Sequence, residues 1–432
     1  MYRQRKSVGG VLVKTNNERI IFHVDVNSAF LSWSAVDAIQ RGSSLDIREI
    51  PSAVGGDVES RHGIILAKSI PAKKYKIQTG EPIFSAKEKC PQLFLVPPNY
   101  DLYVRCNDAM VNILREYTPL VERYSIDECF LDMTTVKGIY KDPVETAFKL
   151  KERIKRELGF TVNIGVSNNK LLAKMGSELK KPDRLHTLFP NEIKDKLWPL
   201  PVSELFMVGR ATSPKLNAMN IYTIGDLANY NLDIIRRKFK SYGVMIWNYA
   251  NGIDSSPVID NKSIEVKSIG NSTTIPFDVE DRTTAHMVLL SLAETVGMRL
   301  RHSENLCQLV YVRYRNNLFM GSAKQRKLKY KTDCTDHINK EACALFDEIW
   351  DGSPIRQLGI SVSQLSTAYI NQVSFFDERN MEKKQRLDKT IDKIRMKYGL
   401  NSLVRSVFLT SGLKPLNGGS PLEKGEERTT IF

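Results

Sequence analysis

Two adjacent carboxylates interrupt an apolar run at Tyr124-Ser125-Ile126-Asp127-Glu128-Cys129-Phe130-Leu131-Asp132. The residues around Asp127 and Glu128 have the character of buried extended chain, where an uncompensated carboxylate is costly. A hard divalent cation is the simplest compensation for such oxygen ligands. A second stretch, Phe22-His23-Val24-Asp25-Val26-Asn27, also has one carboxylate behind an apolar run. We therefore predict that the two stretches meet around metal, and that the rest of the chain presents a nucleotide and a nucleic acid to that metal.

The bulk composition favours a protein of several domains that binds nucleic acid. The chain has 432 residues, which exceeds the usual limit for one core, and its formal net charge of +14 favours a polyanionic partner. No apolar run reaches the roughly 18 residues of a membrane helix, and the basic start does not resemble a signal peptide, so we expect no membrane partner. Six cysteines without a C-x-x-C pair predict reduced thiols and a cytoplasmic location.

The segments around the acidic stretches predict an α+β layer. The residues before Asp25 indicate a buried strand, and residues 28–38 a helix. Asp142-Pro143 has the pattern of a helix start, with Gly159 as its stop, and residues 161–166 indicate another strand. Strand, helix and strand with acidic strand ends describe a sheet covered by helices.

Several residues near these strands could contact a nucleotide. Phe30 lies five residues past Asp25, and a core aromatic is the alternative interpretation. Lys170 stands at the start of a predicted helix, where a phosphate is well placed, although it could equally be a surface lysine. Basic residues also surround the apolar run 64–67, where they could hold an incoming phosphate or form a solvated face. They are Arg61, Lys68, Lys73, Lys74 and Lys76.

A helical segment is predicted after the proline-rich residues 190–201. Residues 205–210, which include Gly209, separate two short helical stretches, and residues 223–226 have the spacing of a capping box. Short helices joined by a glycine hairpin can bind a DNA backbone through main-chain amides. A plain helical connector is the alternative.

The last part of the chain indicates a second domain beyond a linker at residues 251–260. Extended runs at 305–314 and 354–364 alternate with predicted helices at 283–301 and 337–350. From Arg313 to Lys331 there are seven basic residues and no acidic one, which suits a surface that follows a nucleic-acid groove, with a solvated edge strand as the alternative. These residues are Arg313, Arg315, Lys324, Arg326, Lys327, Lys329 and Lys331.

A short aromatic motif closes this domain. In residues 372–376, Phe375 and Phe376 follow Gln372 closely, which is typical of an anchor for a pocket on another protein. A charged helix is predicted at 378–397, and residues 413–432 have the composition of a disordered tail.

Taken together, these motifs resemble those of the Y-family, the translesion DNA polymerases of the DinB/UmuC superfamily, over about residues 19 to 410. The matching segments have the order and spacing of the family's signatures. They are Tyr124 to Glu128, Asp25 to Asn27 with Phe30, Ile164 to Ser167 with Lys170 and Ala173-Lys174, and Lys267 to Gly270 with Thr273-Thr274.

The resemblance implies an α+β multidomain right-hand polymerase. Its parts are a palm of mixed sheet and helices, small fingers, a helical thumb with a helix-hairpin-helix, and an α/β little-finger domain. The expected boundaries are 1–18 for an N-terminal extension, 19–30 and 99–187 for the palm, 31–98 for the fingers, 188–254 for the thumb, 255–266 for a linker, 267–371 for the little finger, 372–376 for a clamp-binding motif and 377–432 for a C-terminal helix and tail.

The resemblance also implies the site. Asp25, Asp127 and Glu128 would be the catalytic metal ligands, assisted by the Val26 carbonyl, and two Mg²⁺ ions would act on a dNTP. Because neighbours in a strand face opposite ways, the chain must bend near Asp127. The expected nucleotide contacts are Phe30 as a steric gate against ribonucleotides, Ala29, Lys73 and Lys170.

Some positions depart from the DinB pattern. Ile70 and Lys73 stand where many DinB members carry Tyr and Arg, and Asn27 stands where many carry a second Asp. These features are closer to the UmuC branch and its Gram-positive plasmid and prophage relatives in UV-damage repair. Met207 replaces a customary Gly in the thumb hairpin, which predicts a less tight turn.

The expected function is error-prone translesion DNA synthesis in the tolerance of DNA damage, as in an SOS-type response. Expected partners are primer-template DNA, a sliding clamp and accessory mutagenesis proteins. The alternative is a catalytically silent accessory protein that binds DNA and the clamp.

Overall fold

The computed structural model describes residues 19–56, 61, 63–260, 266–367 and 379–409. The chain divides into two compact units: residues 1–46 with 102–263, and residues 47–101 with 264–432. The expected N-terminal extension, the Gln372 to Phe376 motif and the C-terminal tail lie outside the described residues.

The first unit is built on a five-stranded sheet with the strand order β5-β6-β1-β7-β8. The strand β1 lies in the centre, antiparallel to both β6 and β7. The five strands are β1 (Ile21–Val26), β5 (Val121–Arg123), β6 (Glu128–Asp132), β7 (Val162–Ser167) and β8 (Leu185–Thr187).

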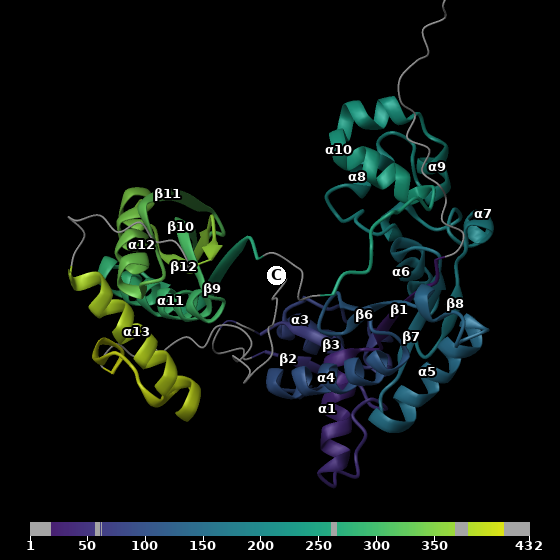
Figure 1. Ribbon diagram of the computed structural model, residues 1–432, viewed down its shortest axis with the longest axis horizontal. Coiled ribbons are helices and arrows are strands. Elements are labelled where there is room, and N and C mark those ends of the chain that lie inside the picture. The colour runs from purple at the N-terminus through teal and green to yellow at the C-terminus, as the bar shows by residue number, and fades with distance from the viewer. Residues whose placement is uncertain (1–18, 57–60, 62, 261–265, 368–378, 410–432) are drawn as a thin grey trace, which may run out of the picture. The chain divides into compact units, whose positions relative to one another are not determined.

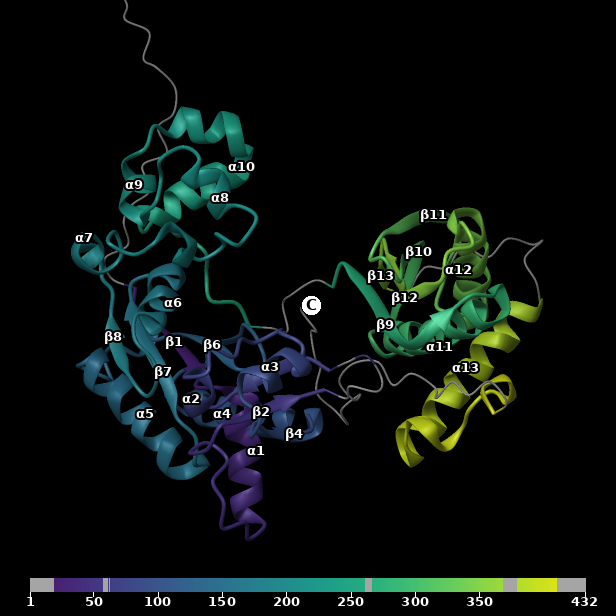
Figure 2. The same cartoon turned by 180° about the vertical axis from the view of Figure 1, so that it is seen from behind.

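The two faces of this sheet are covered by different helices (Figures 1 and 2). One face packs on α1 (Ala29–Gln40), α4 (Tyr100–Tyr117) and α5 (Pro143–Leu158), and it contributes Phe22, Val24 and Val26 of β1 to the main core. The other face packs on α6 (Lys170–Glu178). Because side chains alternate along a strand, His23 and Asp25 point to the α6 face.

The ends of α5 confirm the sequence prediction. The Asp142 carboxylate accepts hydrogen bonds from the backbone N–H groups of Val144 and Glu145, and Gly159 ends the helix with a φ of 75°. Such a side-chain cap satisfies N–H groups that have no partner inside the helix, and a left-handed C-terminal residue favours glycine.

A helical segment follows β8. It contains η2 (Pro190–Glu192), α7 (Ile193–Lys196), η3 (Val202–Glu204), α8 (Ser213–Asn217), α9 (Ile224–Asn229) and α10 (Leu232–Ala250). In the turn before α8, Met207 has a φ of 73°, so it adopts the left-handed conformation usual for Gly, and its carbonyl accepts a hydrogen bond from the Tyr242 hydroxyl at 2.6 Å. The prediction of a less tight turn is therefore wrong. Met207 adopts the left-handed backbone conformation itself, at a conformational cost of about 1 kcal/mol.

The presumed linker after α10 packs against the sheet of the first unit. The carbonyl of Gly252 accepts a hydrogen bond from the Asn169 side chain at 3.0 Å, and Asp254 caps the backbone N–H of Leu171 at 3.1 Å. Val258 is buried in a small cluster with Phe130. Residues 252–259 are thus held in place by α6 and β6, which their composition did not indicate.

The second unit begins with a small three-stranded sheet of order β3-β2-β4. Its strands are β2 (Ser52–Gly55), β3 (Ile65–Lys68) and β4 (Phe94–Val96), and its helices are α2 (Ile70–Lys73) and α3 (Ile83–Lys89). Ala53, Ile65 and Ile83 form part of its own core.

The second unit also contains a four-stranded antiparallel sheet of order β11-β10-β12-β9, with β13 (Ser366–Thr367) paired to β10. Its main elements are β9 (Ser268–Val279), α11 (Arg282–His302), β10 (Asn305–Asn316), β11 (Gly321–Thr332), α12 (Thr335–Ile349) and β12 (Ile355–Ser363). The helices α11 and α12 pack on the face that carries Val310, Val312 and Leu358.

The last described helix, α13 (Arg379–Tyr398), is attached to this domain by buried charges. Arg301 of α11 donates two hydrogen bonds to Asp392, at 2.6 and 3.0 Å, and one to Asp388 at 3.3 Å. Asp388 also accepts the backbone N–H of Thr335 at 2.9 Å and so caps α12. The short helices η5 (Leu400–Ser402) and η6 (Ser406–Phe408) follow α13.

Candidate active site

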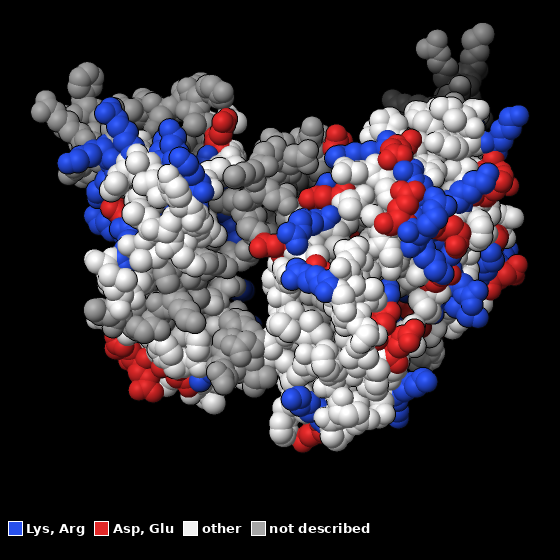
Figure 3. Space-filling model, turned by 90° about the horizontal axis from the view of Figure 1, so that it is seen from below, with Lys and Arg blue, Asp and Glu red and all other residues white. Residues whose placement is uncertain are grey.

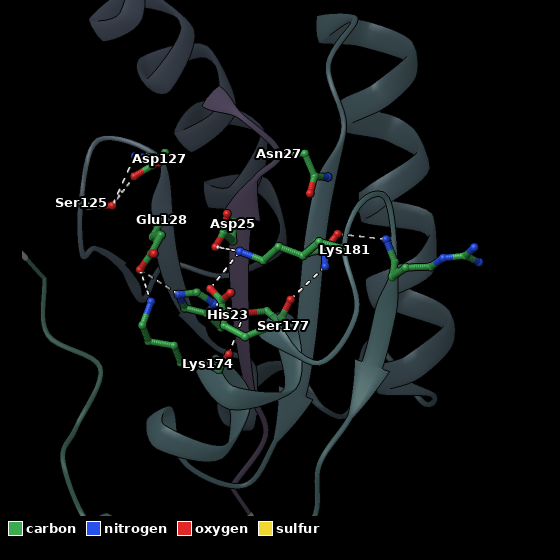
Figure 4. Close-up of polar contacts among 12 residues, drawn as sticks. His23, Asp25, Asn27, Ser125, Asp127, Glu128, Lys174, Ser177 and Lys181 are labelled. Carbon is green, nitrogen blue, oxygen red and sulfur yellow. Dashed lines mark hydrogen bonds and ion pairs between the residues drawn. The ribbon is translucent and has the colours of Figure 1, made fainter. Parts of the chain in front are cut away.

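Asp25 and Glu128 come together through strand pairing. They are directly opposite each other in the antiparallel register of β1 and β6, so both side chains point to the α6 face (Figure 4). Residues opposite each other in such a pair have Cβ atoms about 5 Å apart. The predicted meeting of the two acidic stretches is therefore confirmed by the sheet register.

A third acid joins this pair from α6. Ligand atoms of Asp25, Glu128 and Glu178 all lie within 4.8 Å of one another. The Lys181 ammonium bridges two of them, at 2.7 Å from Asp25 Oδ2 and 2.8 Å from Glu178 Oε1. Burial raises the pKa of Asp25 to about 7, although Lys181 acts to lower it. Carboxylates crowded together in this way, with Asp25 buried among them, favour binding of a further cation.

Asp127 lies just outside this group. It precedes β6 in a bend at residues 125–127, as the sequence analysis required, and its Oδ1 accepts a hydrogen bond from the Ser125 hydroxyl at 2.6 Å. Its carbonyl accepts the backbone N–H of Val26 at 3.0 Å, which fixes the bend beside the end of β1. Burial raises the pKa of Asp127. Figure 4 shows its carboxylate directed toward Ser125.

Glu128 is held from behind by two residues. Its Oε2 lies 3.3 Å from His23 Nε2 and 2.5 Å from Lys174 Nζ (Figure 4). Burial alone would raise the pKa of Glu128, but the hydrogen bond from His23 and the Lys174 ammonium outweigh it and lower this pKa to about 2. Burial lowers the pKa of His23 to about 4. The second oxygen of Glu128, Oε1, has no protein partner among the described residues.

Phe30 and Ala29 occupy the first turn of α1, next to the end of β1. The turn is sharp because Ser28 has a left-handed φ of 48°. The Phe30 ring is only partly buried and stacks on Tyr103 of α4, with ring centroids 4.5 Å apart. Ala29 is buried. Both residues therefore lie close to Asp25 along the chain, and α4 supports the Phe30 ring through Tyr103.

Lys170 is engaged elsewhere. Its ammonium lies 2.7 Å from both carboxylate oxygens of Glu122, and the side chains of the pair are only 13% and 10% exposed. Glu122 also accepts the backbone N–H of Ile259 at 2.9 Å. Glu122 thus joins β5 to the segment after α10, and Lys170 of α6 is its partner, while Lys181 is the cation beside Asp25 and Glu178. Lys73 lies exposed in α2 of the second unit.

The basic residues of β10 and β11 divide between the two faces of their sheet. Lys324 and Arg326 lie opposite Val312 and Val310 on the helix-covered face, and both form ion pairs with Glu348 of α12. The others alternate with the buried residues of β10 and β11, so they belong to the opposite face. They are Arg313, Arg315, Lys327, Lys329 and Lys331. Lys and Arg side chains are also exposed on the face of the molecule drawn in Figure 3.

Glu178, Lys181 and His23 were missed by the sequence analysis. One signal could have found the first two: Lys174, Glu178 and Lys181 follow one another at spacings of four and three residues, as on one helix face. His23 is preceded and followed by apolar residues, and its role depends on packing of α6 that the local sequence does not reveal.

The donor set fits a hard divalent cation. Carboxylate oxygens are the ligands that Mg²⁺, Mn²⁺ and Ca²⁺ accept, and the cluster has no sulfur or imidazole ligand among the described residues.

Comparison with known proteins gives the family. Residues 24–178 match the impB/mucB/samB family, residues 266–375 match the C-terminal domain of that family, and residues 190–221 match the IMS family HHH motif. A DNA polymerase IV of Clostridium acetobutylicum is 50% identical over 392 residues, which cover 90% of this chain and 98% of the relative. The chain belongs to the impB/mucB/samB family. DNA polymerase IV 1 of Bacillus subtilis is 36% identical over 415 residues, which cover 95% of each chain.

The fold agrees with this assignment. A solved Y-family DNA polymerase chimera, Dbh-Dpo4(243-245)-Dbh, matches with a TM-score of 0.70 at 23% identity, over 81% of this chain and 99% of the chimera. The predicted α+β Y-family architecture, with a helix-hairpin-helix motif and a C-terminal little-finger domain, is confirmed. The predicted DNA-directed DNA polymerase activity is likewise confirmed by the relatives.

The expected branch of the family is not borne out by the relatives. The relatives carry the name DNA polymerase IV, which belongs to the DinB branch, so the expected placement near the UmuC branch is not supported. Within the described part of the chain, no helix is both long and apolar enough to cross a membrane.

Proposed function

We propose that the chain performs error-prone synthesis across damaged template DNA by transferring nucleotides at a two-metal site of Asp25, Asp127 and Glu128. The observation that carries this proposal is the opposite pairing of Asp25 and Glu128 on adjacent strands. This pairing brings two carboxylates from distant parts of the chain to one place, where a cation would offset their burial. We assign Mg²⁺ because its octahedral, oxygen-only coordination suits carboxylates and substrate phosphates.

The ions, when bound, would lower the pKa of the primer 3′ hydroxyl and neutralise charge on the triphosphate. Glu128 offers Oε1, since Oε2 is engaged by His23 and Lys174. Asp127 would join the group by turning its carboxylate away from Ser125, a rotation in a partly buried bend that costs one hydrogen bond. The Val26 carbonyl lies at the end of β1, next to Asp25.

Lys181 and Phe30 would bind the nucleotide. The Lys181 ammonium contacts both Asp25 and Glu178, so it can move to the triphosphate once metal replaces it at Asp25. This role was expected for Lys170, whose ammonium is paired with Glu122, and we assign it to Lys181 instead. The Phe30 ring, with Ala29 behind it, would lie under the sugar and exclude a 2′ hydroxyl. Lys73 remains a proposed phosphate contact from the fingers.

Primer-template DNA would bind to two surfaces. The turn at Gly209 offers backbone N–H groups to phosphates without reading sequence. In the little finger, we assign the contacts to the face that carries Arg313, Arg315, Lys327, Lys329 and Lys331. We leave Lys324 and Arg326 out of this set because both form ion pairs with α12.

The other expectations stay as proposals. They are the domain boundaries given above, a sliding clamp bound through Gln372, Phe375 and Phe376, accessory mutagenesis proteins and a cytoplasmic location. A function closer to that of the UmuC branch would depend on the positions that depart from the DinB pattern, which are Asn27, Ile70 and Lys73.

Primer extension with purified protein, Mg²⁺ and the four dNTPs tests the proposal. We expect extension on an undamaged primer-template and past an abasic site, with none after Asp25→Asn. The Asp25→Asn variant should bind DNA within about twofold of the parent, because the acid contacts metal and not the backbone. No extension by the parent protein, with DNA binding intact, would leave the catalytically silent accessory protein as the correct interpretation.

A further inference from the structure

His23 is a fully buried histidine directly behind the metal-facing acids. Its ring has no exposed surface and packs on Phe130, with ring centroids 4.6 Å apart. Nδ1 lies 2.7 Å from the Ser177 hydroxyl of α6, and Nε2 lies 3.3 Å from Glu128 Oε2. The ring thus connects a helix on one side with a carboxylate of the site on the other (Figure 4).

The close approach of α6 depends on the residue beside His23 in the sheet. His23 is paired with Gly165 of β7. A Cβ atom at Gly165 would lie 1.9 Å from the Ala173 carbonyl and 2.5 Å from the Ser177 backbone nitrogen, so only glycine allows the helix to lie this close. The same approach brings Lys174 and Ser177 to the level of His23 and Glu128.

The donors and acceptors of this chain of contacts can be assigned. A carboxylate oxygen only accepts, so the proton between His23 and Glu128 belongs to Nε2. A neutral imidazole has one N–H, which leaves Nδ1 as an acceptor. The single proton of the Ser177 hydroxyl faces two acceptors, Nδ1 of His23 and the Lys174 carbonyl, each 2.7 Å from the hydroxyl oxygen, and this shared contact ties the ring to the backbone of α6. Glu128 Oε2 receives one hydrogen bond from His23 and one from Lys174.

We propose that His23 is a positioning residue that, anchored by Ser177 of α6, holds Oε2 of Glu128 so that Oε1 faces Asp25 and the bound cation. This inference rests on the proposed metal site. Side chains that orient a metal ligand typically change metal affinity or activity by about 10- to 100-fold when they are replaced.

Two replacements of His23 separate its two contacts. In His23→Gln the amide reaches about as far as Nε2 and can still donate to Glu128. In His23→Asn the amide ends near Nδ1, so it can contact Ser177 but not Glu128. We expect the dissociation constant for Mn²⁺, measured on the intact protein by the loss of the free-ion electron paramagnetic resonance signal, to rise about tenfold in His23→Asn and less than threefold in His23→Gln.

Ser177→Ala and His186→Asn complete the set. Ser177→Ala removes the anchor of the ring without touching Glu128, and it should weaken Mn²⁺ binding by less than His23→Asn does. His186 contacts only the Lys180 carbonyl among the described residues, at 3.3 Å, so His186→Asn should bind Mn²⁺ like the parent. Circular dichroism and thermal melting would be recorded for each variant, so that a loss of packing is seen as a loss of the fold.

The outcomes distinguish the positioning role from the metal site itself. If Asp25→Asn does not weaken Mn²⁺ binding, the proposed metal site is wrong. If Asp25→Asn weakens it but His23→Asn does not, the site stands and the positioning role is refuted. Equal loss in His23→Asn and His23→Gln also refutes it, because the donor to Glu128 then makes no difference. If both variants of His23 unfold, unchanged Mn²⁺ binding by a folded Ser177→Ala refutes the anchoring by α6.

Discussion

The directions in which single side chains point decide which of them can take part in the proposed reaction. Asp25 and Glu128 face the same side of the sheet, whereas Asp127 lies in the bend before β6 and contacts Ser125. Phe30 follows the sharp turn at Ser28, and its ring stacks on Tyr103. Each of these directions has a consequence that substitution can reveal.

Replacing Phe30 tests the expected steric gate. Phe30→Ala should raise the ratio of kcat/KM for ribonucleotides to that for deoxynucleotides by at least about tenfold, because the ring that meets the 2′ hydroxyl is removed. Single-nucleotide incorporation measures this ratio. Phe84→Ala, at a ring that is 71% exposed in α3, is the control. An unchanged ratio in Phe30→Ala would remove the gate role.

Lys170 and Lys181 should behave differently. Lys170→Ala leaves Glu122 buried without its partner and should cost about 3 kcal/mol of unfolding free energy, with little change in KM for the dNTP. Lys181→Ala should instead raise that KM about tenfold, because a phosphate contact is lost, and with Mg²⁺ present its stability should stay nearly constant, because the metal offsets the charge of Asp25. Denaturant unfolding and steady-state kinetics check both. The reverse pattern would restore the role first expected for Lys170.

At the scale of elements, the two faces of the little-finger sheet give a matched comparison. Arg315→Gln with Lys327→Gln removes two charges from the proposed DNA face, and Lys324→Gln with Arg326→Gln removes two from the helix face. The first pair should reduce the slope of log K against log salt by about two, and the second pair by less than one. Fluorescence anisotropy with duplex DNA at several salt concentrations measures the slopes. Equal reductions would mean that both faces contact DNA.

Elements were predicted from the sequence where the pattern is local. Asp142-Pro143 and Gly159 indicated the ends of α5, and the carboxylates behind apolar runs indicated that the segments of Asp25 and Glu128 meet, because capping and buried charge are visible in a few neighbouring residues. The partners of Lys170, Arg326 and Lys181 could not be predicted. Those partners depend on strand register and on the approach of α6 at Gly165, which are properties of residues far apart in the sequence.

At the scale of the whole molecule, the chain continues the C-terminal domain past the family match, which ends at residue 375. The helix α13 supplies Asp388 and Asp392 to Arg301, and Arg395 contacts Glu294 of α11 at 3.2 Å. Removing α13 would leave Arg301 and Glu294 buried without these partners. We infer that α13 is part of this domain and not a separable tail.

Truncation tests this inference. Deleting residues 378–432 should lower the stability of the C-terminal domain by about 4 kcal/mol and weaken DNA binding, whereas deleting residues 410–432 should change neither. Thermal melting and DNA titration measure the effects, and the Gln372 to Phe376 motif remains in both proteins. Equal stability of the two truncated proteins would show that α13 is dispensable.

The central claim is that acids on β1 and β6 hold divalent ions against an incoming deoxynucleotide. The most direct test is anomalous scattering from Mn²⁺ in crystals of the protein with primer-template DNA and a non-reactive dNTP analogue. We predict peaks about 2.1 Å from carboxylate oxygens of Asp25 and Glu128, with Asp127 turned in from Ser125 to share one of them. Ordered primer and nucleotide with no Mn²⁺ peak at Asp25 or Glu128 would contradict the account.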